Sequence, residues 1–170
     1  MNKLIDTKLE NLKLRFAKEE DTSTILNFIK DLAEYEKLSD QVVATEDILK
    51  ESLFDREVAE VIIAEYEDEA VAFALFFHNF STFLGKAGIY LEDLYVKPKF
   101  RGKGIGTIML SYLANLAQER NCGRFEWSCL DWNEASINFY KEMGAVAMED
   151  WTVYRVSGSA LDELAQKYDR

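Results

Sequence analysis

One short basic stretch, VKPKFRGKGIG at residues 96–106, carries the residue types that bind phosphate. In a chain whose formal net charge is -11, it interleaves cations with glycines, namely Lys97, Lys99, Arg101 and Lys103 with Gly102, Gly104 and Gly106. Glycines let the backbone approach a phosphate closely, and arginine offers a bidentate geometry for phosphate oxygens. The stretch is therefore a candidate phosphate-binding loop.

Two other interpretations of this loop can be weighed from its spacing. The P-loop needs G-x-x-x-x-G-K-[ST], and the dinucleotide fingerprint needs G-x-G-x-x-G near an early strand, so neither fits the pattern R-G-x-G-x-G found here. A solvated turn, with glycines for chain reversal and lysines for solubility, stays open when the loop is taken alone.

The neighbouring elements place the loop between a strand and a helix. GIYLEDLYV, rich in β-branched and aromatic residues, precedes it, and a helical stripe follows, made of Ile105, Met109, Leu113, Leu116 and Ala117. The first-turn amides of that helix would have no intrahelical acceptor and would carry the positive end of the helix dipole. This setting favours the anion-binding interpretation.

The rest of the chain predicts a mixed α/β domain. Upstream, LKLRF predicts a strand, and residues 21–38 predict a helix capped by Asp21, Thr22 or Ser23. A second helix is expected to start at Thr45. VAEVIIAEY and AVAFALFFHNF predict an antiparallel hairpin that turns at Glu67, Asp68 and Glu69. Downstream, RFEWSCL predicts a strand, EASINFYKEM a helix ending before Gly144, EDWTVYRV a last strand, and ALDELAQKY a terminal helix.

Composition limits the class of protein. The 170 residues, 48% apolar and 30% charged, predict one globular domain over residues 1–170, with residues 1–11 as a candidate flexible extension. No window approaches the roughly 18 apolar residues of a membrane span, so we expect a cytoplasmic protein that does not associate with membranes. The acidic balance argues against nucleic-acid binding. The two cysteines lack metal-site spacing, so we expect no metal.

Two segments carry a family resemblance. YLEDLYVKPKFRGKGIG at 90–106 and LDWNEASINFYKEMGA at 130–145 resemble the two central motifs of the GNAT superfamily of acetyl-CoA-dependent N-acetyltransferases. With LAEYEKLSDQV, they look like the branch that acetylates spermidine, spermine and thialysine, over roughly residues 12–157. The resemblance implies a largely antiparallel sheet flanked by helices, with a splayed parallel strand pair that holds acetyl-CoA.

The resemblance also implies catalytic roles. A protonated alkylamine has a pKa of about 10.4 and must lose a proton before it attacks a thioester. Glu92 matches the family's general base, acting directly or through water, and Tyr140 matches the acid that protonates the thiolate. A backbone amide at a strand bulge, expected at Val96, would stabilise the oxyanion. A solvated carboxylate at Glu92 and a packing aromatic at Tyr140 are the alternatives.

Further positions are implied for coenzyme and acceptor. The expected coenzyme contacts are Leu94, Val96, Arg101, Gly102, Lys103, Gly104, Ile105, Gly106, Asn133, Ser136 and Tyr140. The expected acceptor contacts are Glu34, Tyr35, Glu36, Phe83, Glu92 and Asp93. If the strand were regular, Glu92 and Asp93 would point to opposite faces. Asn133 could also serve as an ordinary helix cap, and Glu34 and Glu36 as a solvated face.

The acceptor class is narrowed by one departure from the family. Members that take spermidine commonly show D-P-W ahead of YLED, whereas STFLG here lacks both the Asp and the Trp. We therefore expect a small primary amine, with thialysine, a lysine-like amino acid or a short diamine ahead of spermine. A protein N-acetyltransferase and a non-catalytic acyl-CoA-binding module are the alternatives. The branch also implies a homodimer.

Overall fold

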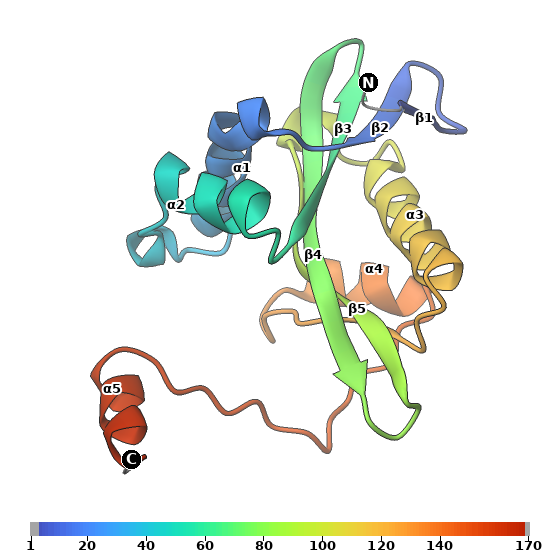
Figure 1. Ribbon diagram of the computed structural model, residues 1–170. Coiled ribbons are helices and arrows are strands. Elements are labelled where there is room, and N and C mark those ends of the chain that lie inside the picture. Colours follow the sequence, from blue (N-terminus) through green and yellow to red (C-terminus); the bar gives the residue numbers. More distant parts are fainter. Residues whose placement is uncertain (1–3, 169–170) are drawn as a thin grey trace. The chain divides into compact units, whose positions relative to one another are not determined.

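The computed structural model describes residues 4–168, which form two compact units divided between Leu130 and Asp131. Six strands of the first unit form one sheet in the order β1-β2-β3-β4-β5-β6 (Figure 1). The strands are β1 Ile5–Asp6, β2 Leu12–Phe16, β3 Glu60–Tyr66, β4 Glu69–Ser81, β5 Lys86–Val96 and β6 Phe125–Trp127. All neighbours are antiparallel except β5 and β6, which are parallel. The expected mixed α/β fold is confirmed.

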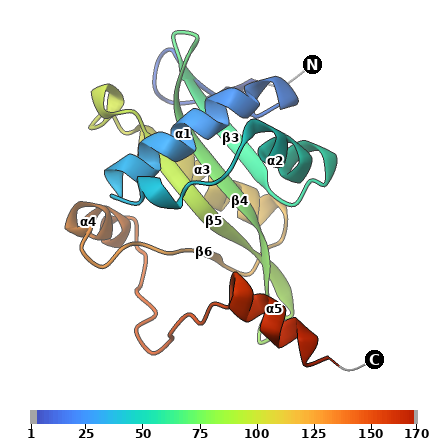
Figure 2. The ribbon, with the colours of Figure 1, turned by 90° about the vertical axis from the view of Figure 1, so that its left-hand side faces the viewer.

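Helices cover both faces of this sheet. The helical segments of the first unit are η1 Glu19–Asp21, α1 Thr22–Tyr35, η2 Ser39–Gln41, α2 Glu46–Lys50, the π-helical turn η3 Glu51–Asp55, η4 Pro98–Phe100 and α3 Ile105–Glu119. Helices α1 and α2 lie over one face, turned toward the viewer in Figure 2, and α3 lies behind the sheet. Within residues 4–168, no helix is long and apolar enough to cross a membrane.

The alternating strand residues explain why each face binds a helix. On the α1 face, the ring of Phe28 stacks on Phe73 at 5.1 Å between centroids and meets Tyr95 at 6.2 Å. On the other face, the predicted stripe of α3 is buried throughout, from Ile105 at 1% exposure to Ala117 at 7%. Apolar residues at period 2 on strands and 3.6 on helices thus produce one layered core.

Several predicted boundaries are confirmed and others are corrected. Thr45 caps α2, since its hydroxyl accepts the Ile48 N–H. The β3–β4 turn has two residues, Glu67 and Asp68, both with positive φ, while Glu69 already belongs to β4. The side-chain cap proposed for Asp21 at the start of α1 is wrong. Its carboxylate instead accepts hydrogen bonds from both terminal nitrogens of Arg15 and from the Lys18 N–H.

The N-terminal extension contributes to the sheet where the structure describes it. Ile5 and Asp6 pair with Leu14 and Lys13, and the Thr7 hydroxyl donates to the Leu12 carbonyl. The flexibility expected for residues 1–3 falls outside the described residues.

The second unit holds α4 Glu134–Glu142 and α5 Ser159–Gln166, as predicted. Gly144, with φ of 86°, follows the end of α4. The predicted last strand at 149–156 is wrong for this structure: the segment is without regular structure, and Trp151, Val153 and Tyr154 are 70%, 80% and 92% exposed. An alternating pattern forms a strand only against a neighbour, and no strand of residues 4–168 pairs with this segment.

Candidate active site

The glycine loop joins β5 to α3 and leaves the first amides of α3 without helical acceptors. Gly102 and Gly104 have φ of 74° and 81°, which side chains rarely adopt. Gly104 is the N-cap of α3 and offers no side-chain cap, and the Ile108 N–H donates to its carbonyl at 3.0 Å. The N–H groups of Ile105, Gly106 and Thr107 therefore precede the first helical hydrogen bond.

This loop is suited to an anion. The space around Gly102 and Gly104 is open, since a Cβ built at either would meet nothing within 4 Å. A 15-residue helix adds the positive end of its dipole at this point. Of the loop residues expected to contact the coenzyme, Gly102, Gly104 and Ile105 thus share one end of α3.

Two of the four cations share a single carboxylate partner. Lys97 and Lys99 each place Nζ 3.1 Å from a carboxylate oxygen of Glu69, and their hydrogen bonds lower the pKa of that carboxyl. Lys103 lies 5.5 Å from the ring centroid of Tyr66 and 5.3 Å from that of Phe100. Glu69 therefore offsets one of the four positive charges, while Arg101 and Lys103 have no carboxylate partner among the described residues.

Arg101 connects the loop with β5 and with the end of α1. Its Nε donates to the Val96 carbonyl at 2.8 Å. Its guanidinium carbon lies 4.9 Å from the ring centroid of Tyr35 and 5.4 Å from that of Tyr95. The structure therefore brings together Arg101 and Val96, expected at the coenzyme, and Tyr35, expected at the acceptor.

Strand β5 is irregular at Glu92. Leu75 pairs with Asp93 and the next residue, Phe76, pairs with Leu91, so Glu92 is the extra residue of a β-bulge. The regular alternation assumed for Glu92 and Asp93 is therefore wrong. The bulge expected at Val96 is also wrong, because Val96 pairs in register with Ala72.

The C-terminal half of β5 has an open edge beside the glycine loop. Strand β6 pairs only with Ile89–Leu91, and within the described residues no strand pairs with Leu94–Val96 on that side. The Lys97 N–H donates to the Val71 carbonyl on β4. In an antiparallel ladder, residues that form such bonds alternate with residues that do not, so the backbone N–H and C=O groups of Leu94 and Val96 point away from β4. An extended chain could bind this edge as an added strand.

Acidic side chains gather between β5 and the end of α1. Burial, followed by the charges of Glu92 and Glu36, raises the pKa of Asp93 to about 6. Burial also raises the pKa of Glu36. Glu92 itself is exposed on the bulge. Three predicted residues, Glu36, Glu92 and Asp93, therefore form one carboxylate cluster.

The sequence analysis missed Asp31 in this region. Burial raises the pKa of Tyr95, and the charges of Asp31 and Glu34 raise it further. Both acids therefore lie near the buried tyrosine of β5 at the acidic cluster. Asp31 comes three residues before Glu34 and four before Tyr35, so helical spacing could have placed it on their face.

Phe83 is not brought to this cluster. It lies in the β4–β5 turn and is 93% exposed. Glu92 lies six positions after Lys86 along β5, a distance of about 20 Å at the usual rise of a strand. Phe83 lies beyond Lys86, on the side away from Glu92 along the chain. Contact of Phe83 with an amine held at Glu92 in the same chain is therefore not supported.

The remaining predicted residues belong to the second unit. Asn133 is buried and caps α4, because its Oδ1 accepts the Ser136 N–H at 3.2 Å. Tyr140 lies on α4 with its ring centroid 5.4 Å from that of Phe139. The cap accounts for Asn133 and Ser136 locally, and the roles of all three residues toward the coenzyme stay predictions.

Comparison with known proteins identifies the family to which the chain belongs. Residues 25–145 match the acetyltransferase (GNAT) family, so the chain belongs to that family of acetyltransferases. It is 39% identical over 171 residues to a thialysine N-epsilon-acetyltransferase from Sus scrofa, which covers 94% of this chain and all of that protein. It is 36% identical over 119 residues to an L-ornithine N5-acetyltransferase from Arabidopsis thaliana, covering 70% of this chain and 49% of that one.

Solved structures confirm the fold. An integron cassette protein from the mobile metagenome of V. cholerae superposes with a TM-score of 0.79 and 26% identity, over 93% of this chain and 99% of that one. The parallel β5–β6 pair, which ends where β5 bulges, is thus part of a shared GNAT architecture.

Proposed function

We propose that this chain transfers an acetyl group from acetyl-CoA to the primary amine of a small molecule. The observation that carries the proposal is the carboxylate cluster of Glu92 and Asp93, on the strand that leads into the glycine loop, with Glu36 at the end of α1. An anion-binding loop and a cation-binding cluster on adjoining segments suit a phosphate-bearing donor and an ammonium acceptor.

Acetyl-CoA fits the residues present. Its diphosphate would be held by the first amides of α3 at Gly104, Ile105 and Gly106, with Arg101 and Lys103 adding charge. Its pantetheine arm would lie along the open edge of Leu94 and Val96 as an added strand. When bound, it supplies the activated acyl thioester, and Asn133 and Ser136 are further proposed contacts.

The protein's own groups would move the protons. Glu92, exposed on the bulge, would accept the proton of the ammonium group directly or through a water, and the amine would then attack by direct transfer in a ternary complex. Tyr140 would donate a proton to the departing thiolate. Since the bulge lies at Glu92 rather than Val96, a backbone amide next to Glu92 is the better candidate to stabilise the oxyanion.

The acceptor proposed is a lysine-like amino acid such as thialysine, or a short diamine. Asp93 and Glu36 would bind the ammonium group, with Glu34 and Tyr35 at the end of α1 beside them. The relatives described above are named for acetylation of thialysine and of ornithine, both primary amines on amino acids. The absence of the D-P-W acid ahead of YLED also favours a short cation over spermine.

We also propose a cytoplasmic homodimer in which residues 1–170 act as a single acetyltransferase domain. Support comes from the exposed apolar segment at 149–156 and from β6, which is the last strand of its sheet and has an unpaired edge among the described residues. Unpaired edges and exposed apolar side chains commonly mark interfaces. Light scattering after size exclusion tests this assembly, and a monomer at all concentrations would contradict it.

The deciding experiment is a panel of amines assayed with acetyl-CoA by release of free thiol. Thialysine, lysine, ornithine, putrescine, spermidine and spermine should be compared with a peptide amine and with no acceptor. We expect the highest kcat/KM among the amino acids or the short diamine. Spermine as best substrate would overturn the acceptor proposal, and thiol release only with the peptide would favour a protein acetyltransferase.

A further inference from the structure

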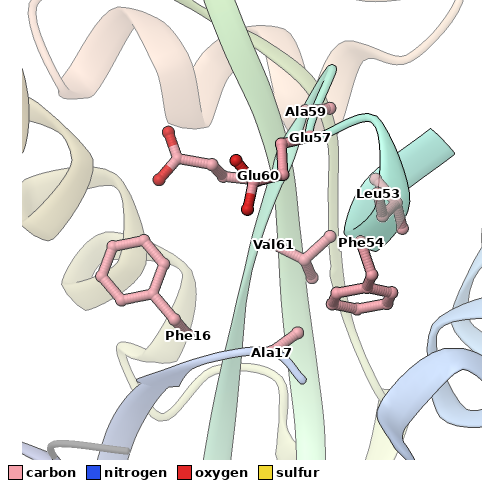
Figure 3. A pocket seen from close by; sticks show the side chains of 8 residues that line it. All are labelled: Phe16, Ala17, Leu53, Phe54, Glu57, Ala59, Glu60 and Val61. Atoms are coloured by element: carbon pink, nitrogen blue, oxygen red, sulfur yellow. The ribbon is translucent and has the colours of Figure 1, made fainter. Parts of the chain in front are cut away.

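A cavity of about 420 Å³ lies away from the glycine loop and the carboxylate cluster, where β2 and β3 separate (Figure 3). The Ala17 N–H donates to the Val61 carbonyl at 2.8 Å, after which the chain turns into η1. Glu60 at the start of β3, and Ala59 before it, therefore have no β2 residue beside them. The cavity opens at this gap.

The π-helical turn η3 forms one wall of the cavity. It directs Leu53 and Phe54 toward the start of β3, where Val61 completes an apolar surface. In Figure 3, the rings of Phe16 and Phe54 stand on either side of Val61. Leu53 and Val61 are 7% and 4% exposed, so core residues form the floor of this open cavity.

Two carboxylates line the same cavity, and they differ in charge compensation. Glu60 is held by both terminal nitrogens of Arg120, so its charge is balanced. Within residues 4–168, the carboxylate of Glu57 has no hydrogen bond or ion pair. In Figure 3 both carboxylates lie at the same end of the cavity. The cavity thus combines apolar walls with one uncompensated negative charge at its mouth.

From this arrangement we propose that the cavity is a second binding site, distinct from the acetylation site, for a small organic ammonium ion with an apolar body. The apolar part would fill the space between Phe16, Phe54 and Val61, and the ammonium group would donate to Glu57. The volume falls within the range of small-molecule sites, so the cavity has room for a ligand with at least one ring or alkyl chain. An anionic ligand would meet Glu57 unfavourably, and a neutral one would gain no electrostatic attraction from it.

Methyl NMR of the full chain tests this site, with phenethylammonium as the probe and the neutral phenethyl alcohol as its matched control. The ammonium ion should shift the methyl signals of Leu53, Ala59 and Val61 in a saturable way, and the alcohol should do so far more weakly. Glu57→Gln should weaken binding roughly tenfold, since a charge-assisted hydrogen bond is lost. Glu51→Gln, an exposed acid on the same turn that does not line the cavity, should leave binding unchanged.

The methyls of Leu94 and Val96 report separately on the acetylation site, so binding there is not mistaken for binding in the cavity. The proposal is overturned if the cavity methyls do not respond, if the alcohol shifts them equally, or if Glu57→Gln binds as the native chain does. Glu57 is exposed, so its substitution leaves the core intact.

Discussion

Asp93 on β5 lies half-buried within electrostatic reach of Glu36 at the end of α1, and burial with the charges of Glu92 and Glu36 raises its pKa to about 6. A carboxyl that titrates near pH 6 changes the charge of the cluster within the range of ordinary assays. Its ionised form attracts an ammonium group and its protonated form does not.

The first prediction concerns the KM for the amine as a function of pH. As pH falls below about 6, Asp93 takes up a proton, and KM should rise. Asp93→Asn should raise KM about tenfold at pH 7.5, because a charge-assisted interaction is lost, and should remove this inflection. Initial rates with varied amine from pH 5 to 8 measure it. Asp40→Asn, an exposed acid on η2, is the control and should keep the inflection.

The second prediction concerns stability. The folded chain holds the Asp93 proton to a pH of about 6, whereas the unfolded chain releases it near 3.8, so this group destabilises the fold increasingly as pH rises from about 4 to 6. Asp93→Asn removes the buried charge. Its free energy of unfolding should exceed that of the native chain by about 1–3 kcal/mol at pH 8, with no gain near pH 4. Urea unfolding at both pH values checks this, and an equal effect at both would contradict it.

Local signals were sufficient to predict most of the fold. Periodicity located β2, the β3–β4 hairpin, α1 and the buried stripe of α3, because each pattern is repeated within a few residues of sequence. The glycine loop was equally local, since Gly102 and Gly104 require positive φ. What sequence could not supply was pairing between distant segments.

The corrections at β5 and at residues 149–156 depend on such distant pairing. The bulge at Glu92 follows from the register of β5 on β4, and alternation along β5 alone suggested a regular strand. The ion pairs of Lys97 and Lys99 with Glu69, about 30 residues away, likewise depend on the pairing of β4 with β5 and could not be predicted from the loop alone. The segment at 149–156 has a strand pattern, but the pattern contains no information about its partner.

The third prediction compares Lys103 with Lys99, which pairs with Glu69. Lys103→Ala should weaken coenzyme A binding about three- to tenfold and reduce its salt dependence, because this cation has no carboxylate partner among those described. Lys99→Ala should change the Kd by less than about twofold, since Glu69, which it shares with Lys97, already offsets part of that charge. Isothermal titration at two salt concentrations separates the outcomes. Equal losses for both variants would show that the ion pairs with Glu69 do not persist.

The fourth prediction concerns the backbone conformation of the loop. Gly104→Ala adds a methyl group where space is open but φ is 81°, so it strains the N-cap and shields the neighbouring amides. The Kd for coenzyme A should rise at least tenfold. Gly85→Ala, with φ of 65° and equally open space in the β4–β5 turn, carries similar strain outside the site. It should lower stability by a similar amount without altering Kd.

The last prediction separates catalysis from binding at the bulge. Glu92→Gln keeps the size of the side chain but cannot accept the proton of the amine, so kcat should fall about 10²- to 10⁴-fold at pH 7.5. Coenzyme A should bind within about twofold of the native affinity, because the phosphate loop and the edge of β5 are untouched. At high pH a larger fraction of the amine is already unprotonated and needs no general base. The loss of kcat relative to the native chain should therefore shrink toward pH 10. A variant with native kcat would show that another group removes the proton, and Asp93, the neighbouring carboxylate in the cluster, would then be the first to test.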